Sequence, residues 1–233
     1  MEKKDISLLL SENSYPGRGI ILGLGKDGNR SVAAYFIMGK SENTRNRIFE
    51  RTSDGIRTKA FDTSTMPDPS LFVYNPVRFV NGFLIVTNGD QTDTIRDYLL
   101  EGRTFRDALL TREFEPDSPI FTPRISGILY PRGIYKLSIL KSAGGISDCC
   151  CRYFYEYSKP IAGTGHLIST YKHDGNPRPS FEGEPICVEI DCGYREFADR
   201  VWESMDKDNK VALYVCEIDR VTGKYESVII NKL

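Results

Sequence analysis

Residues 77–93 read VRFVNGFLIVTNGDQTD, and this stretch decides the fold class. An apolar run lies on each side of Asn81-Gly82, a dipeptide that suits a tight hairpin turn because both residues tolerate positive φ. The second run stops in small polar residues, and apolar side chains then recur at helical spacing over 95–99. The stretch therefore predicts an antiparallel hairpin that leads directly into a helix.

The junction at 87–93 combines short polar side chains with a helix start. Asp90 or Thr92 is placed to cap the helix, because a short side-chain oxygen accepts hydrogen bonds from the first backbone N–H groups. Unpaired N–H groups at a helix start also favour an anion. Two interpretations stay open on these residues alone: a capped turn without a ligand, which is the simpler one, and part of a ligand site.

The same hairpin pattern recurs elsewhere in the chain. Two further hairpins are predicted at 19–38 and 211–230, each with turn-forming residues at its centre. Residues 40–70 are polar and predict an excursion with one short strand at 58–61. Single strands are predicted at 125–130, 134–140, 152–157 and 186–190, and helices at 92–100, 104–110 and 194–204. This pattern predicts an α+β fold with mostly antiparallel sheets rather than a doubly wound parallel sheet.

The composition is that of a globular protein. The 233 residues are 40% hydrophobic and 27% charged, and neither an internal repeat nor a long linker interrupts them. We therefore expect a single domain over residues 1–233. The formal net charge of −1 argues against a broad basic field for nucleic acid, so a small anionic ligand is the expected partner.

The sequence carries no recognised cofactor-binding motif, and it predicts no membrane segment. The charged N-terminus is followed by only a five-residue apolar run at 6–10, too short for a secretory core or a membrane span, so a cytoplasmic location is expected. The chain has two histidines, His166 and His173, and its six cysteines include the adjacent trio 149–151, expected to be reduced. Without paired Cys-x-x-Cys motifs, a P-loop or a Gly-rich dinucleotide fingerprint, we expect no metal and no cofactor.

Arginines recur near the ends of predicted strands. Arg18 precedes the first predicted strand, Arg45 and Arg47 follow the second, and Arg124 opens a later one. The planar five-donor head of arginine suits phosphate oxygens, although a solvated surface position is the ordinary alternative.

Proton-transfer groups also occur near strand ends. Tyr74, with Asn75 beside it, lies just before the central hairpin, and Glu115 follows the helical region. A phenol and a carboxyl can move protons if they are buried.

The order of these pieces resembles the archaeal-type IMP cyclohydrolase family. The resemblance rests on YPGR at 15–18, TRNR at 44–47, YN at 74–75, TNGDQTD at 87–93 and TPRI at 122–125. It is collinear from about Tyr15 to Glu189, and its most specific piece is 86–93 followed by 122–125. No motif after Asp191 matches.

The resemblance implies an activity and a fold. The family closes the ring of 5-formamidoimidazole-4-carboxamide ribonucleotide to give inosine monophosphate, with loss of water. It resembles the four-layer αββα sandwich of the N-terminal nucleophile hydrolases. The implied partner is thus a purine-precursor nucleotide, and the implied process is purine biosynthesis.

The resemblance also implies site residues. The catalytic set would be Arg45 to stabilise developing charge, Tyr74 to donate to the formyl oxygen and Glu115 to handle a proton. The chain departs from the family pattern at 41–43, which leaves open whether Arg45 or Arg47 has which role. The expected substrate-binding residues are Arg18, Arg47 and Arg124 for phosphate, Asn88, Gly89, Asp90 and Thr92 around the base or ribose, and Asn75 without a specified contact.

Two other functions stay open at this stage. One is a nucleotide-binding relative without turnover, and the other is an amidohydrolase of the same fold. The second would need a processed N-terminal nucleophile, and the start Met1-Glu2-Lys3 argues against it. The aromatic run at 153–157 suits a core or an interface, so homo-oligomer formation is a further open expectation.

Overall fold

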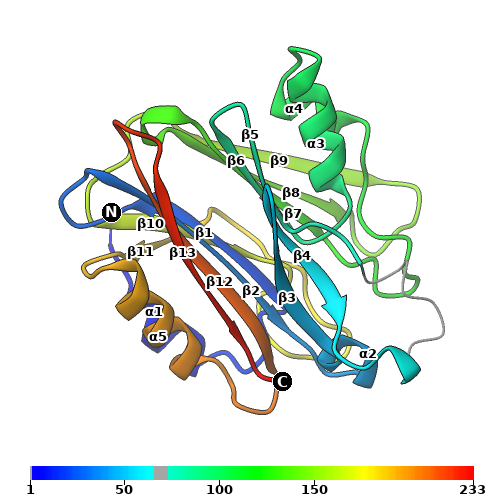
Figure 1. Cartoon of the computed structure of the whole chain (residues 1–233). Coiled ribbons are helices and arrows are strands. Elements are labelled where there is room, and N and C mark those ends of the chain that lie inside the picture. The colour runs from blue at the N-terminus through cyan, green and yellow to red at the C-terminus, as the bar shows by residue number, and fades with distance from the viewer. Residues whose placement is uncertain (1, 66–72) are drawn as a thin grey trace.

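Two antiparallel sheets form the centre of the molecule in a computed structural model that describes residues 2–65 and 73–233 (Figure 1). The six-stranded sheet has the order β11-β10-β1-β2-β12-β13, and the seven-stranded sheet the order β3-β4-β5-β6-β7-β8-β9. The strands of the first are β1 Arg18–Leu24, β2 Arg30–Met38, β10 Thr164–Ser169, β11 Ile186–Glu189, β12 Lys210–Asp219 and β13 Tyr225–Asn231. Those of the second are β3 Arg47–Thr52, β4 Gly55–Ala60, β5 Val77–Val80, β6 Phe83–Thr87, β7 Arg124–Leu129, β8 Tyr135–Ser142 and β9 Cys150–Tyr157.

Helices cover the outer face of each sheet. The α-helices of the described ranges are α1 Ile6–Ser11, α2 Glu42–Arg45, α3 Gln91–Leu100, α4 Phe105–Leu110 and α5 Tyr194–Ser204, with short 3-10 turns at Thr63–Thr65 and Pro131–Gly133. α1 and α5 lie on the six-stranded sheet, while α3 and α4 lie on the seven-stranded sheet (Figure 1). The predicted αββα sandwich of mostly antiparallel sheets is confirmed.

Three buried apolar clusters hold these layers together. The largest lies between the sheets and includes Tyr35, Leu84 and Tyr214. The second packs α1 and α5 on their sheet, and the third packs α3 and α4 on theirs through Ile95 and Phe105. Because each sheet buries both faces, its central strands carry near-continuous apolar runs, as in β1 and β2.

The hairpin and the two helices predicted from local sequence signals over residues 77–110 are confirmed. Asn81 has φ 48° and Gly82 has φ 81°, so both turn residues adopt the positive φ that a tight hairpin needs. Residue pairs run from Val80 with Phe83 to Val77 with Val86. Helix α4 opens with the expected capping box, in which Thr104 and Asp107 bond each other's backbone N–H groups.

Several elements differ from the sequence prediction. Residues 47–60 form the β3–β4 hairpin, where the sequence predicted an excursion with one strand at 58–61. β3 is an edge strand, and polar residues such as Glu50 and Arg57 pair on its exposed face, so the segment lacks a continuous apolar run. The strand β10 and the short helices α1 and α2 were also not predicted. The rest of the predicted excursion, 66–70, lies outside the described residues.

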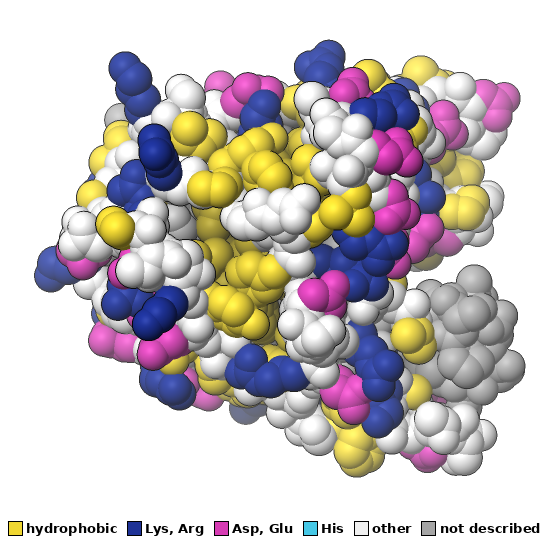
Figure 2. All heavy atoms as spheres, turned by 45° about the horizontal axis from the view of Figure 1, so that its top comes forward, with side chains coloured by type: hydrophobic (Ala, Val, Ile, Leu, Met, Phe, Trp, Pro, Cys, Tyr) yellow, Lys and Arg dark blue, Asp and Glu magenta, His cyan; other side chains and the backbone are white. Residues whose placement is uncertain are grey.

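Some apolar side chains remain at the surface. Figure 2 shows hydrophobic side chains gathered in the middle of one face, with charged side chains around them. Homo-oligomer formation stays a prediction.

Within the described ranges no helix is long and apolar enough to cross a membrane, and no three His, Cys, Asp or Glu side chains form a metal-binding group.

Candidate active site

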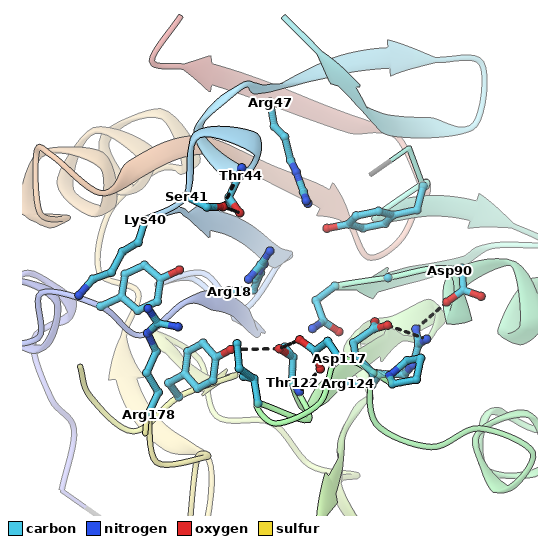
Figure 3. A pocket seen from close by; sticks show the side chains of 18 of the residues that line it. Arg18, Lys40, Ser41, Thr44, Arg47, Asp90, Asp117, Thr122, Arg124 and Arg178 are labelled. Carbon is cyan, nitrogen blue, oxygen red and sulfur yellow. Dashed lines mark hydrogen bonds and ion pairs between the residues drawn. The ribbon is translucent and has the colours of Figure 1, made fainter. Parts of the chain in front are cut away.

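A cavity of about 740 Å³ opens where β2, β6 and β10 end and β1, β3 and β7 begin. Antiparallel pairing brings these strand ends together, although they lie far apart in the sequence. Of the described residues that line it, five are Lys or Arg and three are Asp or Glu, on a chain of net charge −1. The lining residues are Tyr15, Arg18, Lys40, Ser41, Thr44, Arg47, Val73, Tyr74, Asn88, Gly89, Asp90, Glu115, Pro116, Asp117, Ile120, Thr122, Arg124, Tyr171 and Arg178 (Figure 3).

Arg18 and Arg47, here called the arginine pair, bring two guanidinium groups to the cavity (Figure 3). The pKa of Arg47 is lowered to about 10, first by burial and then by the charge of Arg18. Burial also opposes the charge of Arg18, but nearby phenols, with Tyr74 first, raise its pKa overall. Within the described ranges, the Arg18 side chain makes no hydrogen bond or ion pair. Such a cation favours an anionic ligand.

Asp90, Glu115 and Arg124 form a second group, here called the carboxylate cluster. The Arg124 side chain is 8% exposed, and its Nη2 donates to Glu115 Oε2 at 2.9 Å. Its Nη1 donates to Asp90 Oδ1 at 2.6 Å and to Gln91 Oε1 at 2.7 Å. The Arg124 head is therefore occupied by the protein's own acceptors, and it positions two carboxylates beside the cavity.

The two carboxylates of this cluster differ in acidity. Burial raises the pKa of Glu115; Arg124 opposes this, whereas the charges of Asp90 and Asp117 add to it. Burial would also raise the pKa of Asp90, but hydrogen bonds and charge from Arg112 and Arg124 lower it. Environments that separate two neighbouring pKa values in this way are typical of acid–base sites.

Tyr74 lines the cavity from a fixed backbone. Its N–H donates to Thr58 Oγ1 at 3.0 Å, and its carbonyl accepts from the Thr58 N–H at 2.9 Å. Its hydroxyl lies 2.8 Å from that of Tyr35. Hydrogen bonds thus fix both the backbone and the hydroxyl oxygen of Tyr74, which lines the same cavity as Glu115.

Asn88, Gly89 and Asp90 of the junction at 87–93 line the cavity, and hydrogen bonds within the junction hold it in place. Asn88 Nδ2 donates to the Pro123 carbonyl, and Asn88 Oδ1 accepts from Gln91 Nε2 and the Ile125 N–H. Thr92 is fully buried and does not line the cavity; its hydroxyl bonds the Gly89 carbonyl. Asp90 occupies the N-cap position of α3, but its side chain makes no capping bond.

Gly89 shows how closely this junction approaches the carboxylate cluster. A Cβ at this position would lie 2.7 Å from Arg124 Nη1 and 3.0 Å from Glu115 Oε1. Only glycine fits here without displacing those side chains.

Arg45 and Asn75 do not line the cavity. Arg45 ends α2, and its Nε donates to the Gly39 carbonyl at 3.1 Å while Nη2 donates to Asn209 Oδ1 at 3.4 Å. β3 begins at Arg47, which is 5% exposed and lines the cavity. The change from helix α2 to strand β3 therefore directs Arg47 into the cavity and Arg45 away from it, a choice that the sequence left open.

Several lining residues were not predicted as site residues. Tyr15, Thr44 and Thr122 stood within the motifs that carried the family resemblance, so a signal for them existed. No motif pointed to Lys40 or Arg178. Arg178 reaches the cavity from a segment far along the chain.

The tyrosines among these residues form contacts of their own. Tyr171 stacks on Tyr15 with ring centroids 6.0 Å apart, and its hydroxyl lies 3.1 Å from that of Thr122. Thr122 in turn donates to Asp117 Oδ2 at 2.6 Å.

A comparison with protein families identifies the family of this chain. A family model described as IMP cyclohydrolase-like protein matches residues 15–223. The chain belongs to this family. The predicted family resemblance is thereby confirmed, and the matched range includes every described residue that lines the cavity.

Curated proteins named IMP cyclohydrolase are similar to this family member. The one from Methanosphaera stadtmanae is 29% identical over 165 residues, which cover 69% of this chain and 75% of that protein. The one from Methanopyrus kandleri is 30% identical over 160 residues, 67% of this chain and 75% of that protein. The one from Halobacterium salinarum is 32% identical over 132 residues, 55% of this chain and 63% of that protein.

Proposed function

We propose that this protein is an IMP cyclohydrolase of purine biosynthesis. It would convert 5-formamidoimidazole-4-carboxamide ribonucleotide to inosine monophosphate and water. The observation that carries the proposal is the presence in one cavity of the arginine pair, Tyr74 and Glu115. Membership of the family and the names of the curated relatives support the same activity.

The arginine pair is the proposed phosphate site. The Arg18 head has no acceptor within the described ranges, and the charge of Arg18 contributes to the lowered pKa of Arg47. A phosphate monoester would relieve this repulsion and accept charge-assisted hydrogen bonds. Arg124, which was also expected to bind phosphate, is better explained as the residue that positions Asp90 and Glu115.

Tyr74 and Glu115 are the proposed catalytic residues. The carboxamide nitrogen attacks the formyl carbon, a C–N bond forms, and negative charge develops on the formyl oxygen. Tyr74 would donate a hydrogen bond to that oxygen. Glu115 would carry one proton from the attacking nitrogen to the formyl oxygen. The formamido nitrogen would lose the second proton, so that the C–O bond breaks, water leaves and the C=N bond of the new ring forms. The raised pKa of Glu115 suits both steps.

The remaining roles follow from position. Holding both reacting groups of one molecule against a rigid wall contributes to the rate without direct chemistry. Asp90 and Gly89 line the cavity and shape that wall, while Asn88 braces it. Arg47 replaces Arg45 as the proposed partner of developing charge or phosphate. The organisation as one domain and the cytoplasmic location remain predictions.

Turnover of the formamido nucleotide tests the proposal. Purified protein should produce inosine monophosphate, followed by ultraviolet absorbance, well above the spontaneous rate. Glu115→Gln should lower kcat by about 100-fold or more, because a general acid–base group contributes roughly that much. Glu113→Gln is the matched control, since Glu113 is exposed and does not line the cavity. Stabilisation by nucleotides without product would instead indicate a binding protein that lacks turnover.

A further inference from the structure

Tyr35 is a buried tyrosine beside the proposed site. It lies on β2 of the six-stranded sheet, is fully buried, and stacks on Phe49 with ring centroids 5.6 Å apart. Its hydroxyl oxygen lies 2.8 Å from that of Tyr74, which comes from the seven-stranded sheet's side. Within the described ranges this is the one hydrogen bond of the Tyr35 hydroxyl.

The direction of this hydrogen bond follows from burial. Burial, followed by the neighbouring Tyr74, raises the pKa of Tyr35 well above its ordinary value, so the Tyr35 hydroxyl keeps its proton. A buried hydroxyl donates its proton to an acceptor, because an unmade bond is costly there. Either hydroxyl could donate by geometry; because Tyr74 Oη is the acceptor near Tyr35 within the described ranges, we assign Tyr35 as the donor and Tyr74 as the acceptor.

We propose that Tyr35 is a positioning residue that turns the Tyr74 proton into the cavity. A phenol proton prefers the ring plane, on one side or the other. With one side occupied by the proton of Tyr35, the Tyr74 proton takes the side that faces the cavity. This inference rests on the proposed function, in which Tyr74 donates to the formyl oxygen.

The arrangement makes Tyr74 a prepared donor. Its backbone is fixed by Thr58 and its oxygen by Tyr35, so little reorganisation is needed when charge develops on the substrate. A hydroxyl that accepts one hydrogen bond is also polarised to donate a stronger one. Tyr35 touches no substrate in this scheme and acts only through Tyr74.

A double-mutant cycle tests this dependence. Tyr35→Phe keeps the buried ring and removes the donor, and it should lower kcat by about tenfold with KM little changed. Tyr74→Phe should lower kcat by about 100-fold. In the Tyr74→Phe background, adding Tyr35→Phe should cause no further loss, because its target is gone.

Tyr214→Phe is the matched control. Tyr214 lies opposite Tyr35 on the neighbouring strand β12, is equally buried, and does not line the cavity. Tyr214→Phe should change the melting temperature as much as Tyr35→Phe does, but it should leave kcat at the wild-type value.

Two results would overturn the inference while the proposed function stands. One is an active wild type whose kcat is unaffected by Tyr35→Phe. The other is a Tyr35→Phe loss of the same size in both Tyr74 backgrounds. A wild type with no turnover would overturn the proposed function, and the positioning role with it, so the two failures are distinct.

Discussion

Arg18 and Arg124 bring the same guanidinium group to one cavity from different sheets, but their surroundings differ. Arg124, at the start of β7, is bonded to Asp90, Gln91 and Glu115. Arg18, at the start of β1, has phenols around it and no bonded carboxylate within the described ranges. The hydrogen-bond partners of an arginine therefore indicate its role better than its place in a motif does. Arg124 is bonded to the protein's own carboxylates and positions them, whereas Arg18 is available to bind a ligand.

The largest expected effect is on folding, at Arg124. Arg124→Met leaves the half-buried carboxylate of Glu115 without its ion-pair partner, while the exposed Asp90 keeps Arg112, so the free energy of unfolding should fall by about 1.5–3 kcal/mol. Urea denaturation measures this. Arg18→Met should leave the unfolding free energy nearly unchanged, because it removes repulsion from Arg47. Equal losses for both variants would break the comparison.

The complementary effect is on substrate affinity, at Arg18. If Arg18 binds phosphate, Arg18→Met removes charge-assisted hydrogen bonds worth about 1.5–3 kcal/mol, and KM should rise by roughly 10- to 100-fold. Steady-state kinetics with the formamido nucleotide measure this. An unchanged KM would show that the phosphate lies elsewhere.

Gly89→Ala tests how tightly the carboxylate cluster is built. The added methyl group would contact Arg124 and Glu115, so we expect about 1–3 kcal/mol of destabilisation together with a lower kcat. Gly102→Ala is a control for a glycine substitution, because nothing lies within 4 Å of its Cβ position, although its φ of +75° adds strain. Full activity in Gly89→Ala would indicate a looser cluster.

The pH profile of kcat tests the charges around Glu115. Glu115 must be ionised to accept a proton, so the rate should fall as the pH drops through its raised pKa. The charge of Asp117 contributes to raising that pKa. Asp117→Asn should therefore lower the pKa of Glu115 and move the acid limb to lower pH. A shift in the opposite direction would contradict this account of the site.

The smallest effect is expected at Arg45. Its side chain is directed to Gly39 and Asn209 rather than into the cavity, so Arg45→Ala should change neither KM nor kcat appreciably. Its unfolding free energy should change by no more than about 0.5 kcal/mol. Arg47→Ala, two residues away, should raise KM. A large loss of activity in Arg45→Ala would restore the assignment made from the sequence.

Local chemistry explains what the sequence could predict of the fold. The Asn81-Gly82 turn, the Thr104–Asp107 capping box and helix α5 each depend on residues within a few positions of one another. The β3–β4 hairpin escaped prediction because several of its buried positions carry polar or small residues, such as Arg47, Thr58 and Ala60, so buried and exposed positions do not alternate between apolar and polar residues.

The candidate site was less predictable, for a different reason. Family motifs pointed to Tyr74 and Glu115, and both line the cavity. Arg178 and Lys40 arrive there through pairing between distant strands, which no local pattern encodes. The choice between Arg45 and Arg47 depends on where α2 ends and β3 begins, and element boundaries are the least reliable part of a sequence prediction.

The order of strands also suggests how the molecule assembles. The seven-stranded sheet is one continuous meander over residues 47–157, so each strand can pair with its predecessor as the chain emerges. β2 instead pairs with β12, more than 170 positions later, and β1 pairs with β10. Long-range pairings of this kind form slowly because a large loop must close first. The first hairpin, which carries Arg18 and Tyr35, therefore waits for late-synthesised strands, and the cavity is completed near the end of folding.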